Sequence, residues 1–274
     1  MNFKYRNQRN AEATARYWNK PIEKADWYKI EALSEDNTEV LIYDVIGWPF
    51  NDAGEIVRAL AGMNTKTITV RINSPGGDVF DAMSIFNALQ SHKSKIVTRI
   101  ESLAASAASF IALAGKEVQA YQNAMFMIHE PWVLAAGNQY DLREIADILE
   151  KISGNMVDIY SQNSNVGKKE IRDMLKAESW FTAKEAKEKG FIDTIIDGKA
   201  VKAQFDLSMF SHVPDEFQSE THKPTEREIE KALRDVGLSK KEAKALLAGR
   251  SQNTDGADDE VLAAQKLLQS IGGK

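Results

Sequence analysis

Short apolar runs rich in β-branched residues alternate with segments of helical periodicity through the first half of the chain. Each run is bounded by polar residues, glycine or proline, and the runs cover 39–46, 67–72, 95–100 and 124–128. Apolar positions recur at helical spacing in the segments between them, at 53–60, 80–89 and 106–114. Strands and helices that alternate in this order are typical of βαβ units. The pattern therefore predicts an α/β fold with a largely parallel sheet and helices packed outside it.

The spacing changes near residue 140, where one long amphipathic helix is predicted over 140–162. Its apolar positions recur every three or four residues, and they are Leu142, Ile145, Ile148, Leu149, Ile152, Met156 and Ile159. Such a helix can belong to the core or project as an arm that binds another copy of the chain, and both readings stay open. Two shorter helices are predicted at 168–176 and 183–189, followed by a stop at Gly190 and a last strand at 191–196.

The two ends of the chain differ in composition from its middle. The first 30 residues are polar and charged with scattered aromatic residues, which predicts an N-terminal arm. Beyond Pro214, two capping boxes (Thr225 with Glu228, and Ser239 with Glu242) predict a small helical hairpin. Its faces mix acidic and basic residues, so an interaction module is favoured over a DNA-binding helix pair. The expected division is a polar arm at 1–30, a main domain at 31–200, a linker at 201–224, the hairpin at 225–250, and a flexible linker with a short terminal helix at 251–274.

The composition excludes several classes of function. Among 274 residues, 35 are basic and 40 acidic, and the net charge of -5 gives no basic surface of the kind that nucleic acid requires. There is no cysteine, which excludes disulfides, thiolate catalysis and cysteine-ligated metals. The N-terminal residues lack the apolar core of a secretory signal, and no apolar run approaches the roughly 18 residues of a membrane span. We therefore expect a cytoplasmic protein with neither nucleic acid nor a membrane among its partners.

Two short stretches that follow predicted strands could take part in catalysis. The turn at 74–77 (Ser-Pro-Gly-Gly) contains glycines that let backbone N–H groups point into a cleft. Such a turn can donate to an oxyanion, but by itself it is more often a tight connection. The second stretch is a run of small residues from Ser102 to Ser109, in which Ser106 stands at the start of a helix. Ser106 can be a nucleophile on an exposed elbow or a helix N-cap, and taken alone the N-cap is favoured.

A histidine follows the strand predicted at 124–128. The chain holds four histidines, and His129 is the one delivered by an apolar strand, shortly before Pro131 ends the run. A histidine at a strand end is more often a packed residue than a catalytic one. With a serine elbow earlier in the same sheet, a general base becomes the better interpretation.

Together these stretches resemble the proteolytic subunit of the Clp protease, and more closely the Clp-like head-maturation (prohead) proteases of tailed phages and prophages. The resemblance covers roughly residues 27–193 and rests on four stretches in a fixed order. They are Ser-Pro-Gly-Gly at 74–77, Ala-Ala-Ser at 104–106, Met-Ile-His-x-Pro at 127–131 and Glu-Ser-Trp-Phe-Thr-Ala-Lys-Glu-Ala at 178–186. The resemblance implies a Clp-protease/crotonase-like fold over 31–200, which is a repeated ββα superhelix with a long projecting helix. The hairpin at 225–250 is similar to a tail that phage members often carry.

The resemblance also implies roles for individual residues. The catalytic set is Ser106 as nucleophile, His129 as base and Glu178 as acid where the family has aspartate, with Asp173 as the alternative acid. The oxyanion donors are the backbone N–H groups of Gly77 and Ala107, and an extended substrate binds along Asp78, Val79 and Phe80. Two departures from the family, Ser102 for a glycine and Ala107 for a methionine, keep small residues at the elbow. No metal and no organic cofactor are implied.

The implied function is ATP-independent cleavage of capsid or scaffold proteins during phage head maturation, by a serine endopeptidase that assembles with itself into a ring. Independence from an ATPase is expected because the N-terminal residues match no pore-gating segment of the Clp subunit. The expected location is the host cytoplasm or the assembling phage head. Three alternatives remain: a housekeeping Clp subunit that works with an ATPase, a crotonase-like acyl-CoA enzyme, and a catalytically inactive assembly module. A serine-directed probe separates the peptidases from the other two.

Overall fold

The computed structural model describes residues 11–22, 26–133, 135–198 and 205–214, and an eight-stranded sheet forms its centre. The strands are β1 (Tyr28–Ala32), β2 (Asn37–Tyr43), β3 (Thr67–Ser74), β4 (Lys95–Ala105), β5 (Glu117–Tyr121), β6 (Met125–Ile128), β7 (Ser179–Thr182) and β8 (Thr194–Ile196). The helices are α1 (Ala11–Tyr17), α2 (Ala53–Ala61), α3 (Val79–Gln90), α4 (Ala107–Ala112), α5 (Gln139–Gln162), α6 (Lys168–Lys176) and α7 (Ala183–Glu188).

The sheet is mainly parallel, which confirms the α/β class predicted from the alternation of strands and helices. Its main order is β1-β2-β3-β4-β5-β8, while β6 pairs with β4 and β7 pairs with β6. Only the β1–β2 and β6–β7 pairs are antiparallel within the described residues. Three of the strands, β1, β5 and β7, are absent from the sequence-based expectation. Each of them has five residues or fewer, and none carries a continuous apolar run like that of β6.

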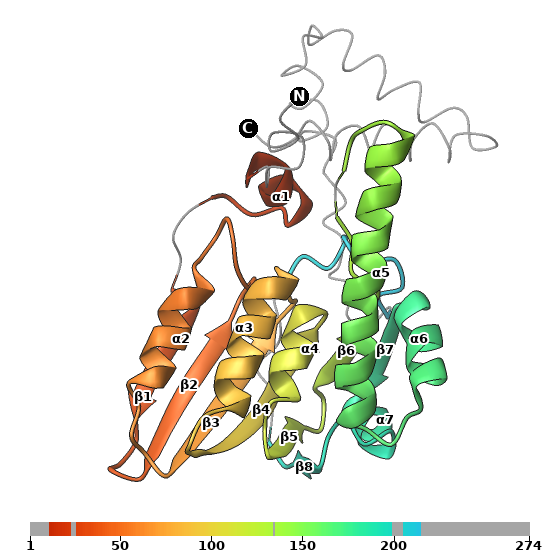
Figure 1. Ribbon diagram of the computed structural model, residues 1–274. Helices are drawn as coiled ribbons and strands as arrows, with labels where there is room; N and C mark the ends of the chain where they lie inside the picture. The colour runs from red at the N-terminus through yellow and green to blue at the C-terminus, as the bar shows by residue number, and fades with distance from the viewer. Residues whose placement is uncertain (1–10, 23–25, 134, 199–204, 215–274) are drawn as a thin grey trace, which may run out of the picture.

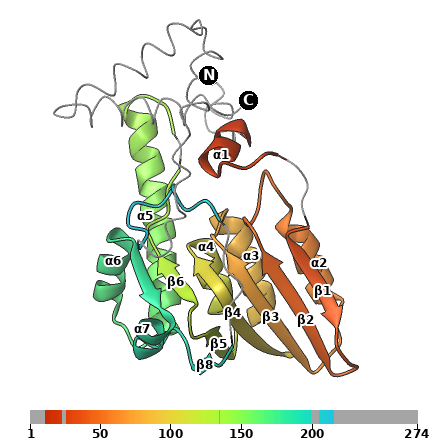
Figure 2. The same ribbon diagram turned by 180° about the vertical axis from the view of Figure 1, so that it is seen from behind.

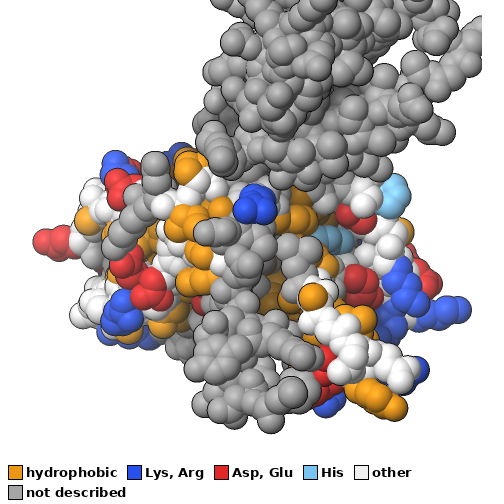
Figure 3. Space-filling model, turned by 90° about the horizontal axis from the view of Figure 1, so that it is seen from above, with side chains coloured by type: hydrophobic (Ala, Val, Ile, Leu, Met, Phe, Trp, Pro, Cys, Tyr) orange, Lys and Arg blue, Asp and Glu red, His pale blue; other side chains and the backbone are white. Residues whose placement is uncertain are grey.

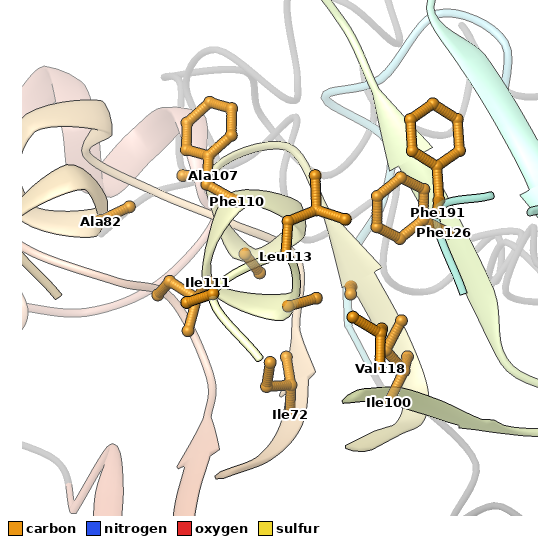
Figure 4. Close-up of a cluster of buried hydrophobic side chains, with 14 of the residues drawn as sticks. Ile72, Ala82, Ile100, Ala107, Phe110, Ile111, Leu113, Val118, Phe126 and Phe191 are labelled. Carbon is orange, nitrogen blue, oxygen red and sulfur yellow. The ribbon is translucent and has the colours of Figure 1, made fainter. Parts of the chain in front are cut away.

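Helices α2, α3 and α4 cover one face of the sheet, and the strands come to the front when the molecule is turned round (Figures 1 and 2). The alternate residues of β3 and β4 that face these helices, such as Ile72 and Ile100, are fully buried. They join Phe110 and Leu113 in one hydrophobic cluster (Figure 4). All six residues of α4 are buried. Because burial of each large apolar side chain is worth about 1.5–3 kcal/mol, α4 is held firmly in the core.

Strand β4 changes partners along its length, and this change creates the edge where the site lies. Its first half, at 97–100, pairs with β5, whereas its last residues, at 103–105, pair with β6. The register between β3 and β4 also shifts near the end of β3. The carboxyl ends of β3, β4 and β6 therefore meet at one edge of the sheet, since these strands are parallel.

Helix α5 combines the two readings that the sequence left open. Its second half belongs to the core, where Met156, Val157 and Tyr160 are buried. Its first half stands clear of the sheet (Figure 1), and there Leu142 is 45% and Ile148 47% exposed. The helix is thus anchored at one end and carries an apolar, exposed surface at the other.

The N-terminal arm expected at 1–30 is not separate from the main domain. The sheet begins inside the segment 1–30, since β1 starts at Tyr28 and Trp27 is buried with its carbonyl accepting from the Tyr43 N–H. The hairpin expected at 225–250 and the segment 251–274 lie outside the described residues. Within the described ranges, no helix has the length and apolar character that crossing a membrane requires.

Candidate active site

Ser106 occupies a sharp turn between the end of β4 and the start of α4. Its φ of 53° and ψ of -124° lie outside the usual regions for a residue with a side chain. The Ser106 N–H donates to the Met127 carbonyl at 2.9 Å, which ties the turn to β6. Ser106 occupies the N-cap position of α4, but its side chain makes no capping hydrogen bond to the helix. The hydroxyl is instead directed to the next element of the site.

That element is His129, one residue beyond β6. Its Nε2 lies 2.7 Å from the Ser106 Oγ, a hydrogen-bonding distance. His129 is only 9% exposed, and this burial lowers the pKa of its ring below the ordinary value, while the negative charge of Glu178 acts in the opposite direction. A lowered pKa keeps the imidazole neutral near pH 7, the form that can accept a proton. The structure therefore brings together the serine and the histidine expected from the sequence.

Glu178 lies near His129 without being hydrogen-bonded to it. The residue immediately precedes β7, whose Ser179 pairs with Ile128 of β6, and it has a positive φ of 49°. Its Oε1 accepts from the His212 backbone N–H at 2.6 Å and, at the long distance of 3.5 Å, from the Trp180 indole. Among the described residues, the recorded hydrogen-bond partner of the His129 ring is Ser106. The carboxylate thus affects the imidazole through its charge.

Asp173, the alternative acid, is placed differently. It lies on α6 with an exposed side chain, and it is not among the groups that shift the His129 pKa. Of the two acids that the sequence offered, Glu178 is the one beside the imidazole.

The glycine turn at 76–77 packs directly against the serine elbow. The Ile46 N–H donates to the Gly76 carbonyl at 2.7 Å, and the Asp78 N–H donates to the Ile46 carbonyl at 2.8 Å. Gly77 has a φ of 148°, and a Cβ there would overlap the Ile46 carbonyl, so that only glycine fits. A Cβ on Gly76 would lie 3.0 Å from the Ala107 nitrogen. The turn and the elbow are therefore in close contact.

Two backbone N–H groups beside the elbow have no acceptor among the described residues. They belong to Gly77 and Ala107, and within the described part of the chain neither donates to a carbonyl or a side chain. Most backbone donors in a folded protein are paired, so adjacent unpaired donors are suited to an anionic oxygen from outside the chain. Both residues are those that the sequence analysis named as donors.

Residues 78–80 form the start of a helix and not a strand, while the binding of an extended substrate along them stays a prediction. Asp78 is the N-cap of α3, and its side chain accepts from the N–H groups of Phe80 and Asp81. Val79 and Phe80 already form the first turn of that helix. The reason is local, because an aspartate placed before an apolar helical run caps it in preference to continuing a strand.

Residues 205–213 contribute to the site, although their sequence did not predict this. This segment falls in the expected linker, yet the Phe210 ring lies 5.5 Å from that of His129, edge to face. The feature of the sequence that could have predicted this packing is a group of closely spaced apolar residues, Phe205, Leu207, Met209, Phe210 and Val213. Seen from above, hydrophobic side chains gather around a histidine, with acidic side chains close by (Figure 3). Within the described ranges, no three His, Asp or Glu side chains form a group that could hold a metal ion.

Comparisons with known proteins agree with this geometry. The family model described as Clp protease matches residues 24–199. An ATP-dependent Clp protease proteolytic subunit of Lactococcus lactis subsp. cremoris is 32% identical over 143 residues, which cover 51% of this chain and 72% of the relative. The subunit of Streptococcus mutans is 34% identical over 143 residues, with 51% and 73% coverage. Proteolytic subunit 1 of Streptomyces coelicolor is 35% identical over 139 residues, with 50% and 64% coverage.

Proposed function

The chain belongs to the Clp protease family of serine peptidases, and we propose that its nucleophile is Ser106 and its general base His129. The observation that carries this proposal is the 2.7 Å distance between the Ser106 Oγ and the His129 Nε2. A neutral imidazole at that distance can remove the hydroxyl proton as the oxygen attacks a carbonyl. The outward turn of Ser106, made without any capping bond, supports the same role.

The proposed reaction is acyl transfer in two stages. The Ser106 Oγ attacks the carbonyl carbon of a peptide bond while His129 takes its proton. The tetrahedral oxyanion accepts from the N–H groups of Gly77 and Ala107, the two donors without a partner beside the elbow. His129 then protonates the departing amine, and a water molecule releases the acyl group by the reverse proton path. Glu178 stabilises the imidazolium that forms in each stage through its negative charge.

A fluorophosphonate probe tests the nucleophile. We expect the probe to label the wild-type chain on Ser106, and Ser106→Ala to remove the label. Ser102→Ala is the matched control, because Ser102 lies in the same run of small residues yet is buried in β4, and it should retain labelling. Full labelling of Ser106→Ala, or its loss in Ser102→Ala alone, would contradict the assignment. A crotonase-like enzyme or an inactive module would leave every variant unlabelled.

We also propose that the substrates are capsid or scaffold proteins of a phage head, cleaved without ATP in the host cytoplasm or the assembling head. The support is the resemblance of the sequence to prohead proteases and of its tail to theirs. The competing proposal is a housekeeping subunit, favoured by relatives whose names include the words ATP-dependent. Co-expression with the neighbouring capsid gene separates the two. Capsid protein should shorten with the wild type but not with Ser106→Ala, whereas cleavage that required a Clp ATPase and ATP would establish the housekeeping role.

Finally, we propose that the chain forms a closed ring with copies of itself through the exposed half of α5. The support is the group of apolar side chains on that half, including Tyr140, Leu142 and Ile148. Leu142→Glu should reduce the mass measured by light scattering toward that of a single 30.6 kDa chain. Arg143→Glu, which introduces the same acid at an exposed polar position next to it, should leave the assembly intact. A wild-type monomer at micromolar concentration would reject the proposal.

A further inference from the structure

Residues 205–213, which we call the covering segment, lie across the candidate active site. In Figures 1 and 2 the described residues of this segment, in cyan, pass over the end of the sheet from above α3 to the side of α6. Its two most buried side chains, Leu207 and Phe210, belong to a small hydrophobic cluster separate from the main core. The buried residues on the other side of this cluster come from β4 and β6, and they are Leu103, Ala105, Met125 and Met127. The segment thus occupies an apolar surface formed by the two strands that deliver Ser106 and His129.

The first contact with the catalytic residues is made by Phe210. Its ring lies 5.5 Å from the His129 ring at an interplanar angle of 76°. It also lies 5.6 Å from the Trp180 ring at 81°. Both arrangements are edge to face, the geometry that aromatic pairs prefer. Phe210 therefore stands beside the base, on a surface that a substrate chain at Ser106 would approach.

The second contact is made by His212 with the acid. The His212 backbone N–H donates to Glu178 Oε1 at 2.6 Å, whereas no hydrogen bond joins Glu178 to the His129 ring in the described structure. A hydrogen bond to a carboxylate is about twice as strong as one between neutral groups. The covering segment thus engages the carboxylate that should orient the imidazole.

The covering segment is itself held from the N-terminal side. The Asn19 side-chain amide donates to Asp206 Oδ2 at 3.0 Å, and the Trp18 and Phe210 rings lie 6.5 Å apart. The Tyr17 hydroxyl points toward the Met209 carbonyl at the longer distance of 3.5 Å. Two segments far apart in the sequence therefore meet above the site, and residues 17–19 fasten the covering segment in place.

We propose that the apolar surface of β4 and β6 binds residues 205–213 of the same chain, and that the bound segment inhibits the enzyme by covering His129 and by engaging Glu178. A peptide substrate must displace the segment before the acid can turn to the imidazole. The inference rests on the proposed roles of Ser106 and His129. The covering segment would then regulate the enzyme, whereas a linker would only connect two domains.

The test uses the full chain and compares matched substitutions in the segment. Phe210→Ala removes the ring beside His129, and His212→Pro removes the N–H that Glu178 accepts from. Ser211→Ala is the control, because it alters an exposed side chain between these two residues and retains the backbone N–H groups. The rate of fluorophosphonate labelling of Ser106 should rise by about tenfold in the first two variants, because the accessible state becomes more populated, and should stay unchanged in the control.

The sign of the effect separates inhibition from a purely structural role. If the segment is only a wall of the substrate pocket, Phe210→Ala and His212→Pro should label at the wild-type rate or more slowly, and KM for a peptide should rise. Inhibition predicts a fall in KM. Thermal melting identifies a variant that fails to fold, and the other variant then decides the outcome.

Failure of the inference can be told apart from failure of the proposed function. Equal labelling of wild type and both variants would overturn the inhibitory role while leaving Ser106 as the nucleophile. Absence of labelling in all of them would overturn both. In that case, the NMR titration of His129 would still show whether Phe210 covers the ring, since Phe210→Ala should then raise its pKa.

Discussion

Ser106 is held by buried main chain, whereas Glu178 is held by a segment that crosses the surface. The elbow is tied to β6 through the Met127 carbonyl, is followed by a helix that is buried throughout, and is closely approached by Gly76. Glu178 instead makes its shortest hydrogen bond to the backbone of the covering segment. The proposed nucleophile, Ser106, is thus positioned by the fold itself, and the proposed acid, Glu178, by a contact that can be exchanged.

The comparison shows which part of the site can be regulated. Moving Ser106 would require the core around α4 to rearrange, and close-packed interiors resist such changes. Moving the Glu178 carboxylate requires its hydrogen bonds from the His212 N–H and, at long distance, the Trp180 indole to be replaced. Displacing the Glu178 carboxylate, the proposed acid, should therefore cost far less free energy than displacing Ser106, the proposed nucleophile.

The largest expected fall in kcat follows substitution of Gly77, in the turn that packs against Ser106. Gly77→Ala places a Cβ against the Ile46 carbonyl at a φ of 148°, so the turn and Ile46 must move apart and the Gly77 N–H is displaced. We expect kcat to fall by about 10²–10³-fold, as when an oxyanion donor is removed. Gly154→Ala is the control, because nothing lies within 4 Å of a Cβ there, and it should keep both kcat and Tm. Retention of activity in Gly77→Ala would show that the turn is not part of the oxyanion site.

Substitution of Glu178 should reduce kcat less than substitution of Gly77 does. Glu178→Gln removes the charge that acts on His129, and we expect kcat to fall by about 10²-fold, less than the ~10⁴-fold seen when the acid is bonded to the imidazole. Asp173→Asn, at an exposed position on α6, should stay within twofold of wild type under the same assay, a surface change of the usual small size. The reverse pattern, with Asp173→Asn damaging and Glu178→Gln nearly silent, would exchange the roles of the two acids.

The same contrast explains how much could be predicted from the sequence. The elbow, the glycine turn and the strand leading to His129 depend on local patterns, and the structure brings these residues together as expected. The helix expected at 80–89 begins one residue earlier, at Val79, because the Asp78 side chain caps it. Strand β7 and the covering segment depend on contacts with β6 and with residues far away in the chain. Contacts of that kind leave no periodicity in a short segment.

A substitution just behind the elbow should affect stability more than rate. The Ser109 Oγ lies 2.6 Å from the hydroxyl of the fully buried Tyr160 and 2.5 Å from the Ser106 carbonyl. Ser109→Ala leaves the Tyr160 hydroxyl without this partner, and the free energy of unfolding should fall by about 1–3 kcal/mol. Adding Tyr160→Phe should recover part of the loss, because no buried hydroxyl then remains unpaired. A double-mutant cycle by denaturant unfolding measures this coupling, and additive effects would contradict it.

The smallest expected effect is a change in the pH dependence of activity. It tests the influence of Glu178 and of Phe210 on the pKa of His129. Catalysis requires neutral His129, so activity should be lost as the pH falls through the pKa of the ring. Burial lowers that pKa, and the wild-type midpoint should lie below the ordinary histidine value of about 6.5. The charge of Glu178 raises the pKa, so Glu178→Gln should move the midpoint of the kcat/KM profile to still lower pH. Phe210→Ala exposes the ring and should move the midpoint upward. An unchanged midpoint in Glu178→Gln would mean that the carboxylate does not act on the imidazole, and the acid role would then have to be given up.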